Sequence, residues 1–424
     1  MIKNNRKIAL AIRIFEFNRL TIPVILHEIE KFNLDSIFGI ELITDTDGLR
    51  KFVLEHKSGL IFYSFMTPHL PQIYREISSI KRNENRNLKL VAGGPHTTGD
   101  PLSSLKAGFD YAYSGAAESG LVQFLQDYLE NRLPHIPAVY QASEFTDLDR
   151  SFPISKIFPI SPPLEISRGC YWNCRFCQTS CRKTLHRSLN SVRKIYNTLK
   201  QRGHNRRINF ICPSAFEYGA ADARHPEPGA IEELLKFCRA EGTSHLEFGI
   251  FPSETRPDTF SEEMVDLISR HCTNRKLTVG MQSGSDRLLK SIRRGHTVKN
   301  VENACRIASR SKLQPHADII LGFPGETSDD RKLTLRVIQK LVKNYGARIH
   351  LHYFIPLSGT DMSEDYPVEL DYRTIDRLRE LERDGVCTGW WQDGRKLSGA
   401  VVHMRDFLRS VSLEYVTIGP GLNS

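Results

Sequence analysis

Cysteine is missing from the first 169 residues of this 424-residue chain, and all nine cysteines follow. Their number is odd, and three of them fall within residues 170–177. A secreted domain held by disulfides would have an even number of cysteines spread along its sequence, whereas closely spaced thiols that are kept reduced are typical of metal binding. We therefore expect an intracellular metal site in the second part of the chain.

Long apolar runs are also missing, since no stretch approaches the roughly 18 residues that a membrane helix needs. The N-terminal stretch 1–17 contains Arg13 and Glu16 within its apolar part and has no small-residue cleavage site. It is thus predicted to be a first strand rather than a signal peptide. We exclude a transmembrane protein, expect no membrane partner and expect a cytoplasmic location.

Acidic residues are absent from residues 166–216, which hold 11 Lys and Arg. Residues 1–150 carry 17 basic against 18 acidic residues, and the rest of the chain carries 41 against 31. The basic stretch has three interpretations: compensation of an anionic cluster, recognition of an acidic substrate such as RNA or a phosphorylated metabolite, or a solvated helix over 188–201. No aromatic-interleaved motif favours RNA.

Residues 1–130 alternate between short apolar runs and amphipathic segments of helical length, which predicts an open, doubly wound parallel sheet of Rossmann-like type. In such a sheet, ligands bind beyond the carboxyl ends of the strands. The predicted strand ends carry Ser64, Gly93, Gly94 and Gly115. Glycines there either let a ligand approach the backbone or simply form a turn.

Residues 131–163 are rich in proline and are predicted to be a linker. Residues 164–362 contain six apolar runs, each followed by a helix-length stretch, which predicts a partial (β/α)6 barrel with functional residues at the carboxyl ends of its strands. Residues 363–424 are predicted to be a mainly helical C-terminal extension. The complete chain is thus expected to be an α/β protein.

Cys170, Cys174 and Cys177 form a CxxxCxxC motif at the end of the first predicted barrel strand. Three thiolates on one loop can hold three irons of a 4Fe-4S cluster and leave the fourth iron open for a substrate. The alternative is a structural zinc ion, for which Cys181 or His186 could supply the fourth ligand. The spacing, and the aromatic Phe176 before the last cysteine, favour the cluster.

The motif, on the first strand of a βα barrel, resembles the radical S-adenosylmethionine (SAM) superfamily. The resemblance implies that the three cysteines ligate a 4Fe-4S cluster and that SAM binds the open iron. One electron from the cluster then cleaves SAM to methionine and a 5′-deoxyadenosyl radical. It further implies an electron donor such as a flavodoxin or a ferredoxin, and these SAM-binding residues: Phe176, Gln282, Ser283, Gly284, Ile320 and Gly322.

One element of the family pattern is missing. The second strand usually ends in a Gly-Gly-Glu-like stretch that binds the amino group of SAM, whereas here residues 210–217 read FICPSAFE. Glu254 and Arg256 could reach the methionine carboxylate or a substrate, or they could cap a helix or form a surface pair. Cys212 could serve a substrate or be a small buried hydrophobe.

The N-terminal sheet resembles the cobalamin-binding domain of class B-like radical SAM proteins, with a Ser at a strand end, then GGPH over 93–96 and an Asp-to-GxxE segment over 110–118. The resemblance implies that Ser64, Gly93, Gly94 and Gly115 contact cobalamin. Methylthiotransferases share the later QSGSD-like segment, but they need three further cysteines in their N-terminal domain. The DxHxxG segment that supplies a cobalt ligand is missing, because residues 15–20 read FEFNRL.

The resemblance implies a cobalamin-dependent radical SAM methyltransferase that acts on an unactivated carbon. The alternatives are a cobalamin-assisted rearrangement, cyclisation or oxidation without methyl transfer, and a non-catalytic cobalamin or redox sensor. The catalytic residues that touch the substrate are not identified by the sequence, and neither is the substrate, which could be a small molecule, a peptide or an RNA.

Overall fold

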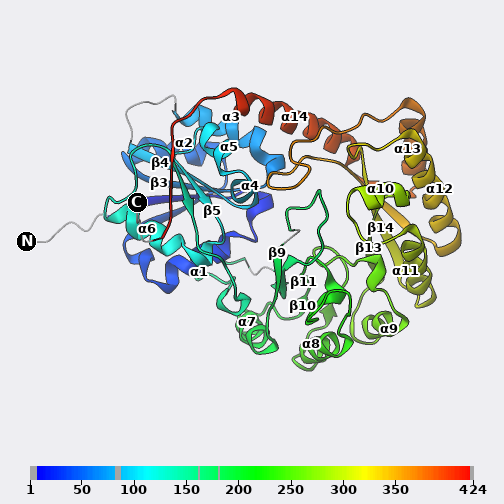
Figure 1. The fold of residues 1–424 in the computed structure, drawn as a ribbon. Helices are drawn as coiled ribbons and strands as arrows, with labels where there is room; N and C mark the ends of the chain where they lie inside the picture. Colours follow the sequence, from blue (N-terminus) through cyan, green and yellow to red (C-terminus); the bar gives the residue numbers. More distant parts are fainter. Residues whose placement is uncertain (1–6, 82–86, 161–162, 180–181, 421–424) are drawn as a thin grey trace, which may run out of the picture. The chain divides into compact units, whose positions relative to one another are not determined.

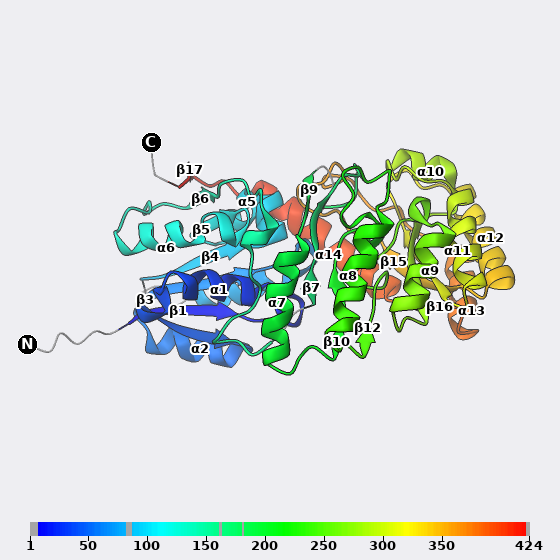
Figure 2. The same cartoon turned by 90° about the horizontal axis from the view of Figure 1, so that it is seen from below.

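The computed structural model describes residues 7–81, 87–160, 163–179 and 182–420, which divide into two compact units. Unit 1 is Met1–Pro162 with Leu357–Gly359 and Gly399–Ser424, and unit 2 is Pro163–Pro356 with Thr360–Ser398. Figures 1 and 2 show the elements of both units. The chain thus returns to its first unit twice after leaving it.

Unit 1 contains, within its described residues, a seven-stranded sheet in the order β17-β6-β5-β4-β3-β1-β2, and every neighbouring pair is parallel. The strands are β1 (Ile8–Arg13), β2 (Phe38–Ile43), β3 (Ser58–Ser64), β4 (Asn87–Gly93), β5 (Tyr111–Ser114), β6 (Ala138–Gln141) and β17 (Val416–Ile418). The predicted Rossmann-like sheet is confirmed.

Helices cover both faces of this sheet, as Figure 1 shows. They are α1 (Ile22–Lys31), α2 (Thr46–Glu55), α3 (Leu70–Lys81), α4 (Pro95–Gly99), α5 (Pro101–Lys106), α6 (Leu121–Leu129) and the second half of α14 (Trp391–Ser410). Because side chains alternate along a strand, β1 sends Leu10 and Ile12 into one core and Ala9 and Ala11 into the other.

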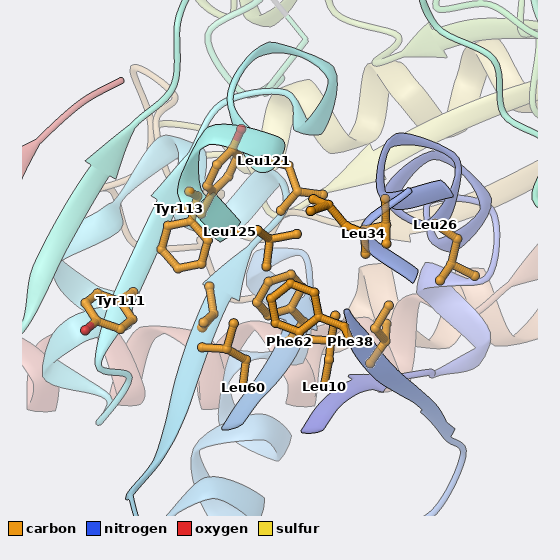
Figure 3. Close-up of a cluster of buried hydrophobic side chains, with 14 of the residues drawn as sticks. Leu10, Leu26, Leu34, Phe38, Leu60, Phe62, Tyr111, Tyr113, Leu121 and Leu125 are labelled. Carbon is orange, nitrogen blue, oxygen red and sulfur yellow. The ribbon is translucent and has the colours of Figure 1, made fainter. Parts of the chain in front are cut away.

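The first core packs α1 and α6 on the sheet, and Figure 3 shows its side chains, Leu10 and Phe62 among them. The second core packs α2, α3 and, through Leu408, the end of α14. Local signals begin these helices: Pro23 lies in the first turn of α1, and the Asp45 carboxylate accepts a hydrogen bond from the Gly48 N–H at the start of α2.

Unit 2 holds helices and partial parallel sheets. Its longest sheet runs β13-β14-β15-β16, preceded by the short pairs β7-β11 and β10-β12 and by an antiparallel hairpin of β8 and β9. The strands are β7 (Leu164–Glu165), β8 (Ser167–Cys170), β9 (Arg182–His186), β10 (Arg207–Ile208), β11 (Phe210–Ile211), β12 (His245–Leu246), β13 (Lys276–Gln282), β14 (Gln314–Leu321), β15 (Arg348–Tyr353) and β16 (Cys387–Gly389).

The helices of unit 2 follow its strands as in a βα barrel. They are α7 (Leu189–Gln201), α8 (Pro228–Ala240), α9 (Glu262–His271), α10 (Asp286–Ser291), α11 (Val298–Arg310), α12 (Ser328–Tyr345), α13 (Tyr372–Arg383) and the first half of α14. The predicted α/β class is confirmed. No helix within the described residues combines the length and the apolar character that crossing a bilayer requires.

Two predicted segments differ from the structure. The predicted linker 131–163 contains β6, which pairs with β5 inside the sheet of unit 1, so this part of the assignment is wrong. β6 has only four residues and lies between proline-rich segments, which is why no strand was predicted there. The extension predicted over 363–424 is divided between both units and adds β16 to one sheet and β17 to the other.

Candidate active site

The three motif cysteines lie on one loop closed by a hairpin. Cys170 ends β8 and pairs with Arg182 at the start of β9, and the described residues 171–179 between the two strands carry Cys174 and Cys177. The Cys177 N–H donates to the Cys174 carbonyl at 3.2 Å, which makes a tight turn between them. The β8–β9 hairpin therefore presents all three thiols on one connected segment.

The donor chemistry of this loop suits a cluster. Among the described residues, no three His, Cys, Asp or Glu side chains converge on a single metal ion. In a cubane cluster each thiolate ligates a different iron, so the sulfurs need only surround the cluster. Of the zinc alternatives, Cys181 lies outside the described residues, and His186 Nδ1 is 2.8 Å from Ser167 Oγ, within hydrogen-bonding distance.

Arg294 lies against the cysteine loop. Its Nη1 donates to Cys174 Sγ at 3.5 Å and its Nη2 to the Gly280 carbonyl at 3.2 Å. A Cβ on Gly280 would lie 2.6 Å from Nη2, so glycine in β13 is what allows this arginine to approach. Nothing in the sequence around Arg294 indicates that its side chain faces a thiol, so this contact was not predicted.

Arg256 joins the same network from the loop after β12. It is buried, its guanidinium lies 3.7 Å from the centre of the Trp172 ring, and it pairs with Asp258 at 3.0 Å. Its Nη2 also donates to the Arg294 carbonyl at 2.7 Å. Its Nη1 is buried and has no hydrogen-bond partner among the described residues.

Of the alternatives for Arg256, a surface pair does not fit, because the arginine side chain of the pair with Asp258 is only 3% exposed. An unsatisfied buried guanidinium N–H costs free energy unless a ligand completes it. The position of Nη1 therefore indicates a site for an anionic group beside the cluster loop.

Glu217 supplies a carboxylate at the end of the second barrel strand, where the sequence showed no Gly-Gly-Glu stretch. It is buried, accepts a hydrogen bond from Trp172 Nε1 at 2.8 Å and lies 3.8 Å from Arg256. Burial raises its pKa above the ordinary value for Glu. It borders a cavity of about 400 Å³, which Tyr171 and His186 also line.

Inside the barrel, Glu254 and Asp318 form a carboxyl pair on either side of β13. Burial, and then the neighbouring Glu254, raise the pKa of Asp318 to about 8. Burial also raises the pKa of Glu254. The pair therefore holds a shared proton at neutral pH.

The predicted SAM residues on β13 separate into two groups. Gln282 ends the strand with φ +65°, is buried, and its Oε1 has no hydrogen-bond partner among the described residues. Ser283 and Gly284 instead pack on α12. The Gly284 N–H donates to Thr334 Oγ1 at 3.0 Å, and a Cβ on Gly284 would lie 2.5 Å from the Thr334 Cα.

The other predicted SAM residues form an apolar wall. Phe176 of the cysteine loop and Ile320 of β14 join one cluster with Phe323, and the Phe176 and Phe323 ring centres are 5.2 Å apart. Gly322 follows β14 with φ +77°, and a Cβ there would lie 2.6 Å from the Tyr353 ring. The structure thus brings residues from the cysteine loop and the fifth strand together.

In unit 1, Ser64, Gly93, Gly94 and Gly115 lie at the carboxyl edge of the sheet, as predicted strand ends should. Packing explains two of the glycines: a Cβ on Gly94 would lie 2.7 Å from the Phe65 nitrogen, and one on Gly115 would lie 2.8 Å from Ala142 Cβ. Gly93 has only the Tyr63 carbonyl within 4 Å of such a Cβ. Their contact with a cofactor stays a prediction.

Solved structures resemble both units together. The chain aligns with the radical SAM methyltransferase TsrM of Kitasatospora setae at 15% identity, with a TM-score of 0.57 over 84% of this chain and 76% of the other. It aligns with OxsB, a cobalamin-dependent SAM radical enzyme, at 14% identity, with a TM-score of 0.59 over 90% and 56%. At such low identity, these alignments establish the fold.

Curated relatives cover part of the chain. An uncharacterised protein of Methanopyrus kandleri is 26% identical over 333 residues, which are 65% of this chain and 62% of that protein. The tRNA-2-methylthio-N(6)-dimethylallyladenosine synthase of Nocardia farcinica is 27% identical over 234 residues, 52% of this chain and 45% of that enzyme. The chain therefore spans less than two thirds of the length of these relatives.

The family comparison covers the barrel. Residues 164–338 match the radical SAM superfamily, the segment that carries the cysteine loop, β13 and β14. The radical SAM family implies a 4Fe-4S cluster and SAM. The chain thus carries, in residues 164–338, a segment that matches the radical SAM superfamily, and a Rossmann-like unit precedes it.

Proposed function

We propose that this radical SAM enzyme binds cobalamin and methylates an unactivated carbon. The observation that carries the SAM-binding part is the buried Arg256, which lies over Trp172 of the cysteine loop and whose Nη1 has no hydrogen-bond partner in the part of the chain that the structure describes. The cobalamin part is supported by the fold shared with TsrM and OxsB across both units.

Cys170, Cys174 and Cys177 would hold the cluster. When bound and reduced, the cluster supplies the electron that cleaves SAM to methionine and a 5′-deoxyadenosyl radical. The Arg294 guanidinium, 3.5 Å from Cys174 Sγ, places a positive charge beside the anionic thiolates. This charge would stabilise an electron added to a bound cluster, and the bond from Arg294 to the Gly280 carbonyl holds the loop against β13.

Arg256 and Glu217 would bind the two charged ends of the methionine part of SAM. Arg256 Nη1 can donate to its carboxylate, and Glu217 can accept from its amino group, which would take the role of the missing Gly-Gly-Glu stretch. Gln282 Oε1 can accept from a hydroxyl, and Phe176 with Ile320 offers an apolar face to the adenine. Together they would exclude water from the reacting sulfonium.

The carboxyl edge of unit 1 would hold cobalamin, which carries a methyl group when bound. Gly93 leaves its backbone open to a ligand, and Ser64 ends the neighbouring strand. A rearrangement, cyclisation or oxidation without methyl transfer is the alternative reaction on the same cofactors. The substrate is proposed to be a small molecule, a peptide or an RNA, and the electron donor a flavodoxin or a ferredoxin.

Several curated relatives are tRNA methylthiotransferases by name. The absence of cysteine from residues 1–169 argues against the same reaction here, since those enzymes need three further cysteines in their N-terminal domain. The relationship therefore supports the barrel and its cofactors rather than a shared substrate.

The test is anaerobic reconstitution of the full chain with iron, sulfide and cobalamin, followed by reduction with SAM present. We expect four irons per chain, retained cobalamin after gel filtration, and release of 5′-deoxyadenosine. Cys174→Ala should abolish cleavage, whereas Cys238→Ala, a buried cysteine in α8, should leave it unchanged. Cleavage that survives Cys174→Ala would contradict the cluster assignment.

Release of S-adenosylhomocysteine alongside 5′-deoxyadenosine would support methyl transfer, because the methyl group must come from a second SAM. Release of 5′-deoxyadenosine alone, with cobalamin retained and substrate present, would favour the rearrangement or oxidation. Wild-type chain that retains no cobalamin would contradict the cobalamin part while leaving the radical chemistry standing.

A further inference from the structure

The loop after β1 occupies the place where a DxHxxG segment would supply a histidine to cobalt. In residues 15–20, FEFNRL, the third position is Phe17. The segment is well fixed: the Asn18 side chain donates to the Arg13 and Ser64 carbonyls at 3.0 Å and accepts from the Phe15 N–H at 2.8 Å. Phe17 is thereby held at the carboxyl edge of β1 and β3.

A histidine from the next loop lies directly on Phe17. His69 ends a short 3-10 helix (Thr67–His69) that follows β3, and its ring stacks on the Phe17 ring with centroids 3.4 Å apart and planes 13° apart. The imidazole of His69 thus lies directly against the side chain of Phe17, the third residue of the segment that stands in place of DxHxxG.

The His69 ring is neutral and has a backbone partner. Burial lowers its pKa to about 4 and outweighs a hydrogen bond with the Met66 backbone, which acts in the opposite direction, so the ring is neutral near pH 7. None of the described side chains hydrogen-bonds its Nδ1. Neutral imidazole is the form that binds metals. The other histidine at this edge, His96, has its two ring nitrogens engaged with Thr67 Oγ1 at 3.1 Å and Ser103 Oγ at 2.7 Å.

We propose that His69 is the axial nitrogen ligand of cobalt when cobalamin is bound, in place of the histidine of the absent DxHxxG segment. The proposal rests on the proposed cobalamin binding. Coordination uses the lone pair of the neutral ring and displaces a water or the cobalamin's own base, so no electron or proton has to be supplied.

The test is electron paramagnetic resonance of the full chain loaded anaerobically with cob(II)alamin, prepared with natural and with nitrogen-15 histidine. A bound imidazole splits the cobalt lines into triplets with nitrogen-14 and into doublets with nitrogen-15. We expect the labelled wild-type protein to give doublets. Triplets in the labelled protein would assign the nitrogen to the cobalamin's own base, and lines without splitting would show no nitrogen ligand; both overturn the proposal.

Variants give an independent readout. His69→Phe should retain cobalamin and lose the doublets, because an aromatic ring still stacks on Phe17 but cannot coordinate. His56→Phe is the matched control, since His56 pairs with Glu41 on the surface of the same unit. Doublets that persist in His69→Phe would overturn the proposal. A wild-type chain that retains no cobalamin would overturn the proposed cofactor and the ligand together.

Discussion

Both units contain deeply buried arginines, and Arg13 of unit 1 differs from Arg256 of unit 2 in how completely its hydrogen-bond donors are satisfied. Arg13 in unit 1 donates to both oxygens of Glu76 at 2.9 Å and to the Ile14 and Ile43 carbonyls at 2.9 and 3.2 Å. Arg256 in unit 2 leaves Nη1 without a partner within the described residues. A saturated arginine stabilises a fold, whereas an unsaturated one is prepared for a ligand.

The neighbours of the two arginines support this distinction. Tyr63 donates to Glu76 at 2.8 Å, so the first pair is closed on every side by its own sheet and helices. The second lies over Trp172 of the cysteine loop and beside Arg294, so positive charge accumulates where a cluster and a carboxylate would bind. The same residue type is thus structural in one unit and held for binding in the other.

The largest expected effect is on the stability of unit 1. Arg13→Met leaves Glu76 buried without its partner, which should cost about 3–5 kcal/mol of unfolding free energy. Hydrogen exchange of the β1 and β3 amides measures this loss. Arg50→Met, which removes an exposed pair with Asp47, should change stability by less than about 1 kcal/mol. Equal losses in both variants would remove the basis for calling Arg13 structural.

The next effect is on SAM affinity. Arg256→Gln removes the unpaired N–H and its charge, and we expect equilibrium dialysis of the reconstituted protein to show about 10- to 100-fold weaker SAM binding. The SAM affinity of Arg256→Lys should lie between those of the wild type and Arg256→Gln, because an ammonium keeps the charge but cannot replace the planar guanidinium. Arg13→Met should bind SAM like the wild type. If Arg256→Gln were less stable but bound SAM like the wild type, Arg256 would be a structural residue like Arg13, and the proposed difference between the two arginines would be wrong.

Part of this architecture could be predicted from sequence, because some signals are local. The strand ends of unit 1 and the cysteine loop follow from apolar runs and close spacing. Strands β6 and β17 could not be predicted from the sequence, because each is short and is stabilised by pairing within the sheet rather than by a local pattern. The contact of Arg294 with Cys174 could not be predicted, because it joins residues 120 positions apart.

The glycines predicted to contact cofactors also show what cannot be told from sequence. Gly94, Gly115 and Gly284 were assigned to cofactors through the family resemblance, yet each avoids a clash with the protein's own backbone or side chains. A glycine needed for packing and one needed for a ligand look alike in sequence. The difference appears only when the neighbour that fills the space is known.

Unit 2 should also respond to pH through Asp318. Its pKa is raised to about 8 in the folded chain, so its contribution to stability is complete below the ordinary carboxyl pKa and is lost as pH rises through about 8. The free energy of unfolding of Asp318→Asn should therefore equal that of the wild type in acid and exceed it by on the order of 1 kcal/mol at alkaline pH. Thermal unfolding from neutral to alkaline pH measures this. Asp222→Asn is the control, because the Arg224 N–H lowers the pKa of Asp222 and its removal therefore leaves the slope in this pH range unchanged.

The smallest effect concerns Cys212, whose polar atom is satisfied like those of Arg13. The thiol is buried, donates to the Ser214 carbonyl at 3.1 Å, and burial raises its pKa to about 12, so it stays protonated and unreactive. Cys212→Ala should cost about 1 kcal/mol of stability and leave 5′-deoxyadenosine formation within about twofold of the wild type. If Cys212→Ala instead lost most SAM cleavage while its cluster content stayed unchanged, a fully hydrogen-bonded buried group would serve the chemistry. Whether a buried polar group is fully hydrogen-bonded would then not distinguish structural from functional residues in this barrel.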